Sequence, residues 1–101
     1  MENKSICNVD NDGTKRWFMN GVLHREDGPA IEFSNGEKQW YINGKLHRLD
    51  GPAIIYSNGR VNWFVNGYSI MNKIVPWAEE NEIDLDNLTE VDIALIKIVW
   101  S

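Results

Sequence analysis

Cysteine and long apolar stretches are scarce in this chain of 101 residues. Cys7 is the single cysteine, so no disulfide can form within the chain, and nothing points to an oxidising compartment. No stretch approaches the ~20 apolar residues that a membrane-spanning helix needs, and the first five residues lack the apolar run of a signal peptide. We therefore expect one small cytoplasmic domain over residues 1–101 that does not contact a membrane.

Basic residues are scarce in the last part of the chain. Residues 74–101 hold seven acids against Lys97 alone, whereas residues 1–73 hold nine Lys or Arg against eight Asp or Glu. This distribution provides no basic stripe for a phosphate backbone, which argues against binding to duplex DNA. Two interpretations of the acidic segment stay open: a solvated helix face, or a docking surface for a basic partner.

One unit is repeated three times with a period of 23 residues. It appears as Trp17-Phe18-Met19-Asn20-Gly21, Trp40-Tyr41-Ile42-Asn43-Gly44 and Trp63-Phe64-Val65-Asn66-Gly67. Leu23-His24-Arg25-Glu26-Asp27-Gly28-Pro29-Ala30 recurs as Leu46-His47-Arg48-Leu49-Asp50-Gly51-Pro52-Ala53. A fixed period of this length is typical of repeat proteins, in which each unit buries its apolar surface against its neighbours.

The Asn-Gly pairs predict the strands and their register. Asn-Gly between apolar residues favours a two-residue type I′ hairpin, which around Asn43-Gly44 opposes Tyr41 to Leu46, Trp40 to His47 and Gln39 to Arg48. If Asn35-Gly36 is also a two-residue loop, Ile31 faces Trp40 and Ala30 faces Tyr41. A three-residue loop at Ser34-Asn35-Gly36 would instead shift the Ala-Ile strand by one residue. At each Asp-Gly-Pro we expect a kink that lets the strand leave one partner and join the next.

This register sorts the side chains onto two faces, because directly opposed residues share a face. The face that we assign to the core carries Trp17, Met19, His24, Ile31, Phe33, Trp40, Ile42, His47, Ile54, Tyr56, Trp63, Val65 and Ile70. The other face, which we expect to be wetter, carries Arg16, Phe18, Leu23, Arg25, Ala30, Glu32, Gln39, Tyr41, Leu46, Arg48 and Phe64.

The segment 71–101 is expected to be mainly helical and to cover the Trp face. Residues 72–82 suit a helix with Asn72 as cap and Pro76 in the first turn. Thr89-Glu90-Val91-Asp92 resembles a capping box that opens a second helix. Residues 94–100 could instead form a terminal strand, but we favour the helix. The predicted fold is α+β and mostly β: an antiparallel hairpin meander over residues 12–70 with a C-terminal helical segment packed on the sheet.

The unit Trp-Tyr-x-Asn-Gly-x-Leu-His-Arg-x-Asp-Gly-Pro-Ala resembles MORN-type repeats, in the variant found in bacteriophage and giant-virus proteins. The resemblance covers residues 12–70, and the third unit is incomplete. It implies an array of β-hairpins used as a binding or assembly surface, a viral origin and no enzyme activity. The lipid binding described for some members is not expected here, because this chain has fewer glycines, carries His-Arg and ends in an acidic segment.

The two histidines, His24 and His47, invite a catalytic interpretation. Equivalent residues of adjacent hairpin units lie roughly 10 Å apart, whereas a general acid and base must share one proton path. Ile70 stands at the equivalent position of the third unit, which suits a packing residue whose polar head finds a backbone partner. We therefore expect no catalytic residue. One cysteine and two histidines without metal-ligand spacing also predict no metal and no cofactor.

The wetter face provides the candidate binding site. Its stripe of one aromatic per unit consists of Phe18, Tyr41 and Phe64, flanked by Arg16, Arg25 and Arg48. Aromatic and arginine side chains are enriched in interface hot spots. Glu79 and Glu80 would attract a basic partner. The predicted function is a non-catalytic protein-binding module, a small viral protein that modulates or inhibits a host protein in the host cytoplasm or serves in defence.

Two alternatives stay open, together with the choice of face. One is sequestration of a small anionic or nucleotide ligand by His24, His47, Arg25 and Arg48. The other is a structural or assembly role, which includes a homo-oligomer.

Overall fold

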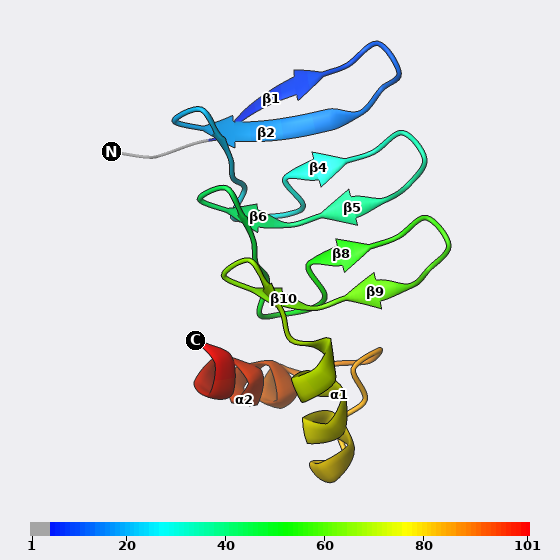
Figure 1. Ribbon diagram of the computed structural model, residues 1–101, viewed down its shortest axis with the longest axis vertical. Coiled ribbons are helices and arrows are strands. Elements are labelled where there is room, and N and C mark those ends of the chain that lie inside the picture. Colours follow the sequence, from blue (N-terminus) through cyan, green and yellow to red (C-terminus); the bar gives the residue numbers. More distant parts are fainter. Residues whose placement is uncertain (1–4) are drawn as a thin grey trace.

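The computed structural model describes residues 5–101 and shows three hairpin units stacked along one axis, with two helices at one end (Figure 1). The first unit contains β1 (Ile6–Val9), β2 (Lys15–Met19) and β3 (Val22–Leu23). The second contains β4 (Ile31–Glu32), β5 (Lys38–Gln39), β6 (Tyr41–Ile42) and β7 (Lys45–Leu46). The third contains β8 (Ile54–Ile55), β9 (Val61–Asn62), β10 (Phe64–Val65) and β11 (Tyr68–Ser69), followed by α1 (Met71–Glu80) and α2 (Glu90–Trp100).

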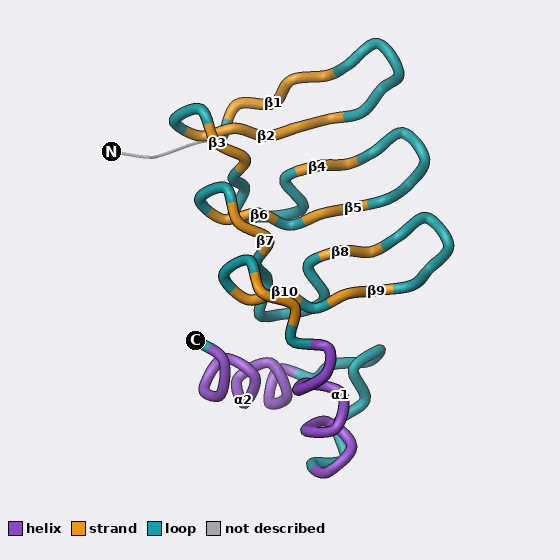
Figure 2. Tube along the Cα trace, viewed as in Figure 1, coloured by secondary structure: helices purple, strands orange, loops and turns teal. Residues whose placement is uncertain are grey.

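Each unit contributes a long hairpin and a short one, which lie on opposite sides of the stack (Figure 2). The long hairpins form one antiparallel sheet in the order β1-β2-β4-β5-β8-β9, with β3 paired to β2. The short hairpins β6-β7 and β10-β11 are separate two-stranded pairs. They are linked across units by backbone bonds of 2.8 Å, from the Gly44 N–H to the Leu23 carbonyl and from the Gly67 N–H to the Leu46 carbonyl. The repeats are therefore joined into one continuous array.

The predicted register of the short hairpins is confirmed. Tyr41 pairs with Leu46, and the His47 N–H donates to the Trp40 carbonyl at 3.0 Å. Asn43 has φ +51° and Gly44 φ +79°, both in the left-handed region that a type I′ turn requires. The pairing of Gln39 with Arg48 is wrong. Gln39 lies between Ile31 and Ile54 in the large sheet, because the chain changes partners at Trp40.

The predicted register of the Ser-Asn-Gly hairpin is also wrong, because its loop has three residues. Ile31 pairs with Gln39 rather than with Trp40, and the Phe33 N–H donates to the Glu37 carbonyl at 2.9 Å. Gly36 has φ +95°, as expected of the last residue in a three-residue hairpin loop that needs a left-handed conformation. Ala30 is buried, so its predicted place on the wetter face is wrong.

Both C-terminal helices form, but α1 spans Met71–Glu80 rather than the predicted residues 72–82. Thr89 and Asp92 make the reciprocal bonds of a capping box, and α2 continues through Trp100, so residues 94–100 are helical. The cap position of α1 is Ile70 rather than Asn72, and its side chain makes no cap hydrogen bond. Pro76 lies inside α1, beyond the first turn.

The main core lies between the third unit and the helices. Trp63, Val65, Ile70, Ile74 and Ile96 form a buried cluster. Leu49, Met71, Trp77, Leu85, Leu88 and Trp100 pack against it. The helices are therefore packed on the sheet as predicted, but they close the end of the stack instead of covering the Trp face along its length. The fold is α+β and mostly β.

Candidate binding surfaces

Arginine covers the tryptophan rings that the helices do not reach. The Arg25 Cζ lies 3.8 Å from the centroid of the Trp17 ring, and the Arg48 Cζ lies 3.9 Å from that of Trp40. A guanidinium over an indole face is attracted by the ring quadrupole and shields the ring from water. The predicted location of Arg25 and Arg48 on the face opposite the tryptophans is therefore wrong. The strands end at Leu23 and Leu46 before either arginine is reached.

The remaining residues of the Arg-x-Asp-Gly-Pro motif hold each guanidinium in place. Arg48 Nε donates to Asp50 Oδ1 at 2.8 Å, and Arg48 Nη1 donates to the Pro52 carbonyl at 3.0 Å. Arg25 makes the same two bonds, to Asp27 at 3.0 Å and to the Pro29 carbonyl at 3.1 Å. Each aspartate thus accepts a hydrogen bond from the arginine side chain of its own motif.

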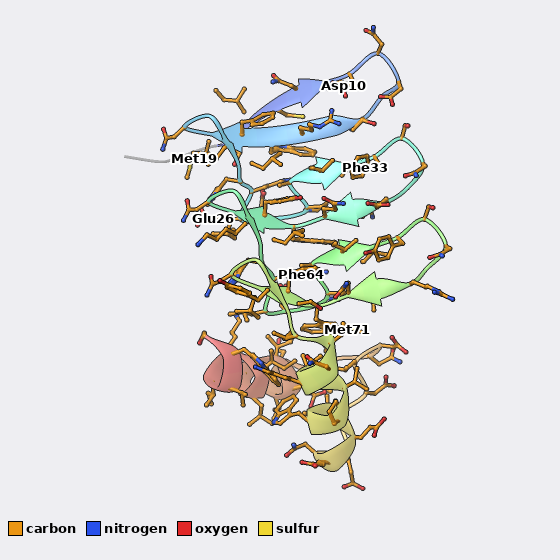
Figure 3. All side chains as sticks on the ribbon, in the orientation of Figure 1. Asp10, Met19, Glu26, Phe33, Phe64 and Met71 are labelled. Carbon is orange, nitrogen blue, oxygen red and sulfur yellow. The ribbon has the colours of Figure 1, made fainter. Side chains whose placement is uncertain are left out.

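Glycine is required in this motif because the guanidinium occupies the space of a side chain. A Cβ added to Gly51 would lie 2.6 Å from Arg48 Cζ, and one added to Gly28 would lie 3.0 Å from Arg25 Cζ. The third unit has no arginine over its tryptophan. Met71 stands one period after Arg48 and packs against the Trp63 cluster, and Figure 3 shows it at the start of α1 below Phe64. Trp63 consequently becomes 1% exposed under the helices.

The histidines link consecutive units. His24 Nδ1 accepts the Asn43 N–H at 2.9 Å, and His47 Nδ1 accepts the Asn66 N–H at 3.0 Å. An imidazole that accepts at Nδ1 is neutral and carries its proton on Nε2. Desolvation lowers the pKa of His47, which favours this neutral form. Among residues 5–101, the buried Nε2 of His24 has no hydrogen-bond partner. Each histidine therefore fixes the Asn-Gly turn of the next unit.

The predicted aromatic stripe is present as a column of equivalent positions on the short hairpins. Phe18 pairs with Leu23, Tyr41 with Leu46 and Phe64 with Ser69. The three rings are half-buried. We call Phe18, Tyr41 and Phe64 the aromatic ladder.

The central ring of the ladder is held in place by a neighbouring side chain. The Tyr41 hydroxyl donates to Gln39 Oε1 at 2.9 Å. Two effects raise the pKa of Tyr41: desolvation, which is the larger, and the negative charge of Glu37. Tyr41 is therefore a neutral, oriented hydrogen-bonding ring at the centre of the array.

The predicted arginines have ion-pair partners of their own. Arg16 is paired with Asp10, Arg25 with Asp27 and with Glu32 on β4, and Arg48 with Asp50. Glu79 and Glu80 are exposed on α1. The structure places the three aromatics at equivalent positions of the short hairpins, whereas Arg25 and Arg48 are held over Trp17 and Trp40.

An open cavity of about 390 Å³ lies between the first two units and α2. Its lining is Arg25, Glu26, Asp27, Gly28, Trp40, Ile42, His47, Arg48, Leu49, Asp50 and Lys97. Three cations meet three carboxylates there, so the cavity does not favour an anion by net charge. This arrangement gives the predicted anionic ligand less support than a protein partner. Among the described residues, no group of three or more His, Cys, Asp or Glu side chains could hold a metal ion.

An apolar surface on α2 was not among the predicted sites. Val91, Leu95, Ile98 and Val99 are 68%, 40%, 77% and 50% exposed. Positions 91, 95 and 98 follow the spacing i, i+4, i+7 that defines one helix face. The signal was present in the sequence, because residues 93–100 are apolar apart from Lys97, and a helix that is apolar on all sides cannot bury every side chain against one neighbour. Over residues 5–101, no helix is both long enough and apolar enough to cross a bilayer.

Comparison with protein-family models, with curated proteins and with solved structures found no significant similarity.

Proposed function

We propose that this protein is a non-catalytic protein-binding module whose contact surface is the aromatic ladder. The observation that carries the proposal is the equivalence of the three rings. Phe18, Tyr41 and Phe64 occupy the same position in three short hairpins of identical register. An extended partner can use one such contact per unit.

The hydrogen bonds between consecutive units support this use. The short hairpins are fixed to one another by the Gly44 and Gly67 backbone bonds and by His24 and His47. Binding to a surface that is already ordered loses little conformational entropy. The resemblance to MORN-type repeats agrees with a binding role, and the modulation or inhibition of a host protein by a viral protein belongs to the same proposal.

The test is affinity capture with three forms of the full chain: the parent, Tyr41→Ala and Tyr56→Ala. Tyr56 is a matched control because it is a partly exposed tyrosine outside the ladder. We expect the parent and Tyr56→Ala to retain the same protein from a lysate and Tyr41→Ala to lose it. Equal capture by all three forms, or no retained protein, would contradict the proposal.

A further inference from the structure

The outer face of α2 is a second surface that the aromatic ladder does not involve. The inner face of the helix is occupied: Ile96 is fully buried, and Trp100 packs against the core with its ring 4.9 Å from that of Trp77. The opposite face exposes Val91, Leu95 and Ile98, with Val99 beside them. Contiguous exposed apolar side chains of this kind are unfavourable in water and mark interaction sites.

The charge around this face determines the kind of partner. Glu90 and Asp92 flank Val91 in the first turn of α2, and Asp84 and Asp86 are exposed in the loop that leads into the helix. Hydrogen bonds from Asn87 and from the Asp86 N–H lower the pKa of Asp84, so it stays charged. The segment 74–101 holds seven acids and one lysine. A partner that approaches the N-terminal end of this face therefore meets the carboxylates of Glu90 and Asp92, in a segment that is acidic overall.

Two occupants fit this surface poorly. A second copy of the chain would bring two acidic segments together, and like charges at an interface are unfavourable. A membrane with anionic lipids would repel the same acids.

We propose that the outer face of α2 docks a basic amphipathic helix of another protein. Val91, Leu95 and Ile98 would contact the apolar side of that helix, as in ordinary helix–helix packing. Glu90 and the acids before it would face its lysines or arginines. Apolar contact supplies the affinity, and the charge selects the partner and increases the association rate.

The test uses the full chain and two synthetic peptides of equal length. Both peptides have leucine at the heptad a and d positions; one has lysine and the other glutamate at the remaining positions. Three forms are titrated at physiological salt: the parent, Val91→Gln with Ile98→Gln, and Ile6→Gln with Val9→Gln. The last pair is a matched control, because Ile6 and Val9 are 71% and 62% exposed on β1, in the first unit.

We expect the parent and the β1 control to bind the lysine peptide equally. The α2 variant should bind it at least about 10-fold more weakly, and the glutamate peptide should bind the parent at least about 10-fold more weakly than the lysine peptide does. Circular dichroism of both variants checks that the helices persist, as glutamine at exposed positions allows.

Five results would overturn the proposal. Equal affinity of the parent and the α2 variant for the lysine peptide, or no binding at all, would show that the apolar face is not used. Equal affinity of the parent for both peptides would show that the face does not select a basic partner. If the parent sediments as a dimer and the α2 variant as a monomer, the occupant of this face is a second copy of the chain. If the parent binds phosphatidylserine vesicles and the α2 variant does not, the occupant of this face is a membrane. None of these results bears on the aromatic ladder, since Tyr41 is unchanged in every form.

Discussion

The guanidinium of Arg48 lies over the ring of Trp40, and Gly51 leaves the space that it occupies. The same relationship joins Arg25, Trp17 and Gly28 one unit earlier. It accounts for the repeated Trp and Arg-x-Asp-Gly-Pro elements by one packing device, in which each unit covers its own indole. The third unit gives up this device, and the helices cover Trp63 instead.

Gly51→Ala should destabilise the protein by about 1–3 kcal/mol, the usual range for an overpacked site. The added Cβ would lie 2.6 Å from Arg48 Cζ, and the guanidinium cannot move without losing Asp50, the Pro52 carbonyl and the Trp40 ring. Urea unfolding measures the effect. In an Arg48→Ala background the same glycine change should cost much less, and an equal cost in both backgrounds would show that Arg48 is not the obstacle.

Gly44→Val should lower the free energy of unfolding by more than about 1 kcal/mol, because a β-branched residue resists positive φ. Gly44 has φ +79°, and its nearest neighbour for a Cβ is Val22 at 3.5 Å. The cost is therefore conformational rather than steric. An unchanged melting temperature would contradict the type I′ turn.

The inter-unit bond of His47 predicts a pH dependence of stability. Desolvation holds the folded-state pKa of His47 below its usual 6.5, so the unfolded chain binds more protons as the pH falls through that value. The free energy of unfolding should therefore decrease between pH 7.5 and 5.5, with the His47 contribution fully present above the unfolded pKa.

His47→Leu should reduce this slope while changing stability only modestly at pH 7.5, since Ile70 occupies the equivalent position. Partner binding should be retained. An identical slope in the parent and the variant would remove His47 as the titrating group, and loss of binding by a folded variant would restore a ligand role for the histidines.

The acidic residues Glu79 and Glu80 on α1 should affect mainly the rate of association with a partner. Reversal of rim charges changes mainly the association rate and its salt dependence, so Glu79→Lys with Glu80→Lys should slow association with a basic partner at low salt and have little effect at high salt. Stopped-flow measurements over a salt series separate the two regimes. Loss of binding at every salt concentration would move the main contact surface from the ladder to the C-terminal segment.

Local chemistry explains what was predictable from the sequence. The Asn-Gly turns fixed the register of Tyr41 and Leu46 because both turn residues need positive φ, and Thr89 with Asp92 identified the start of α2. The Ser34-Asn35-Gly36 loop was ambiguous, because Asn-Gly also ends three-residue loops, and a shift of one residue exchanges the faces.

Tertiary packing explains what was not predictable. The alternation of side chains along a strand puts Arg48 and Trp40 on different faces only if the strand continues to Arg48. It does not, because β7 ends at Leu46. Beyond that point, the guanidinium position depends on Asp50, Pro52 and Gly51 together. The exposed face of α2 was not predictable for a different reason. The apolar composition of the helix indicates burial, but only the Ile96 side packs against the third unit.

Calorimetric titration of the captured partner with the parent, Tyr41→Ala and Tyr56→Ala tests the proposed binding role most directly. If the aromatic ladder is the contact surface, Tyr41→Ala binds about 30-fold more weakly, as for a central hot-spot aromatic worth ~2 kcal/mol. Tyr56→Ala binds like the parent, and all three forms remain folded. Equal affinities of the parent and Tyr41→Ala would contradict the ladder as the binding surface.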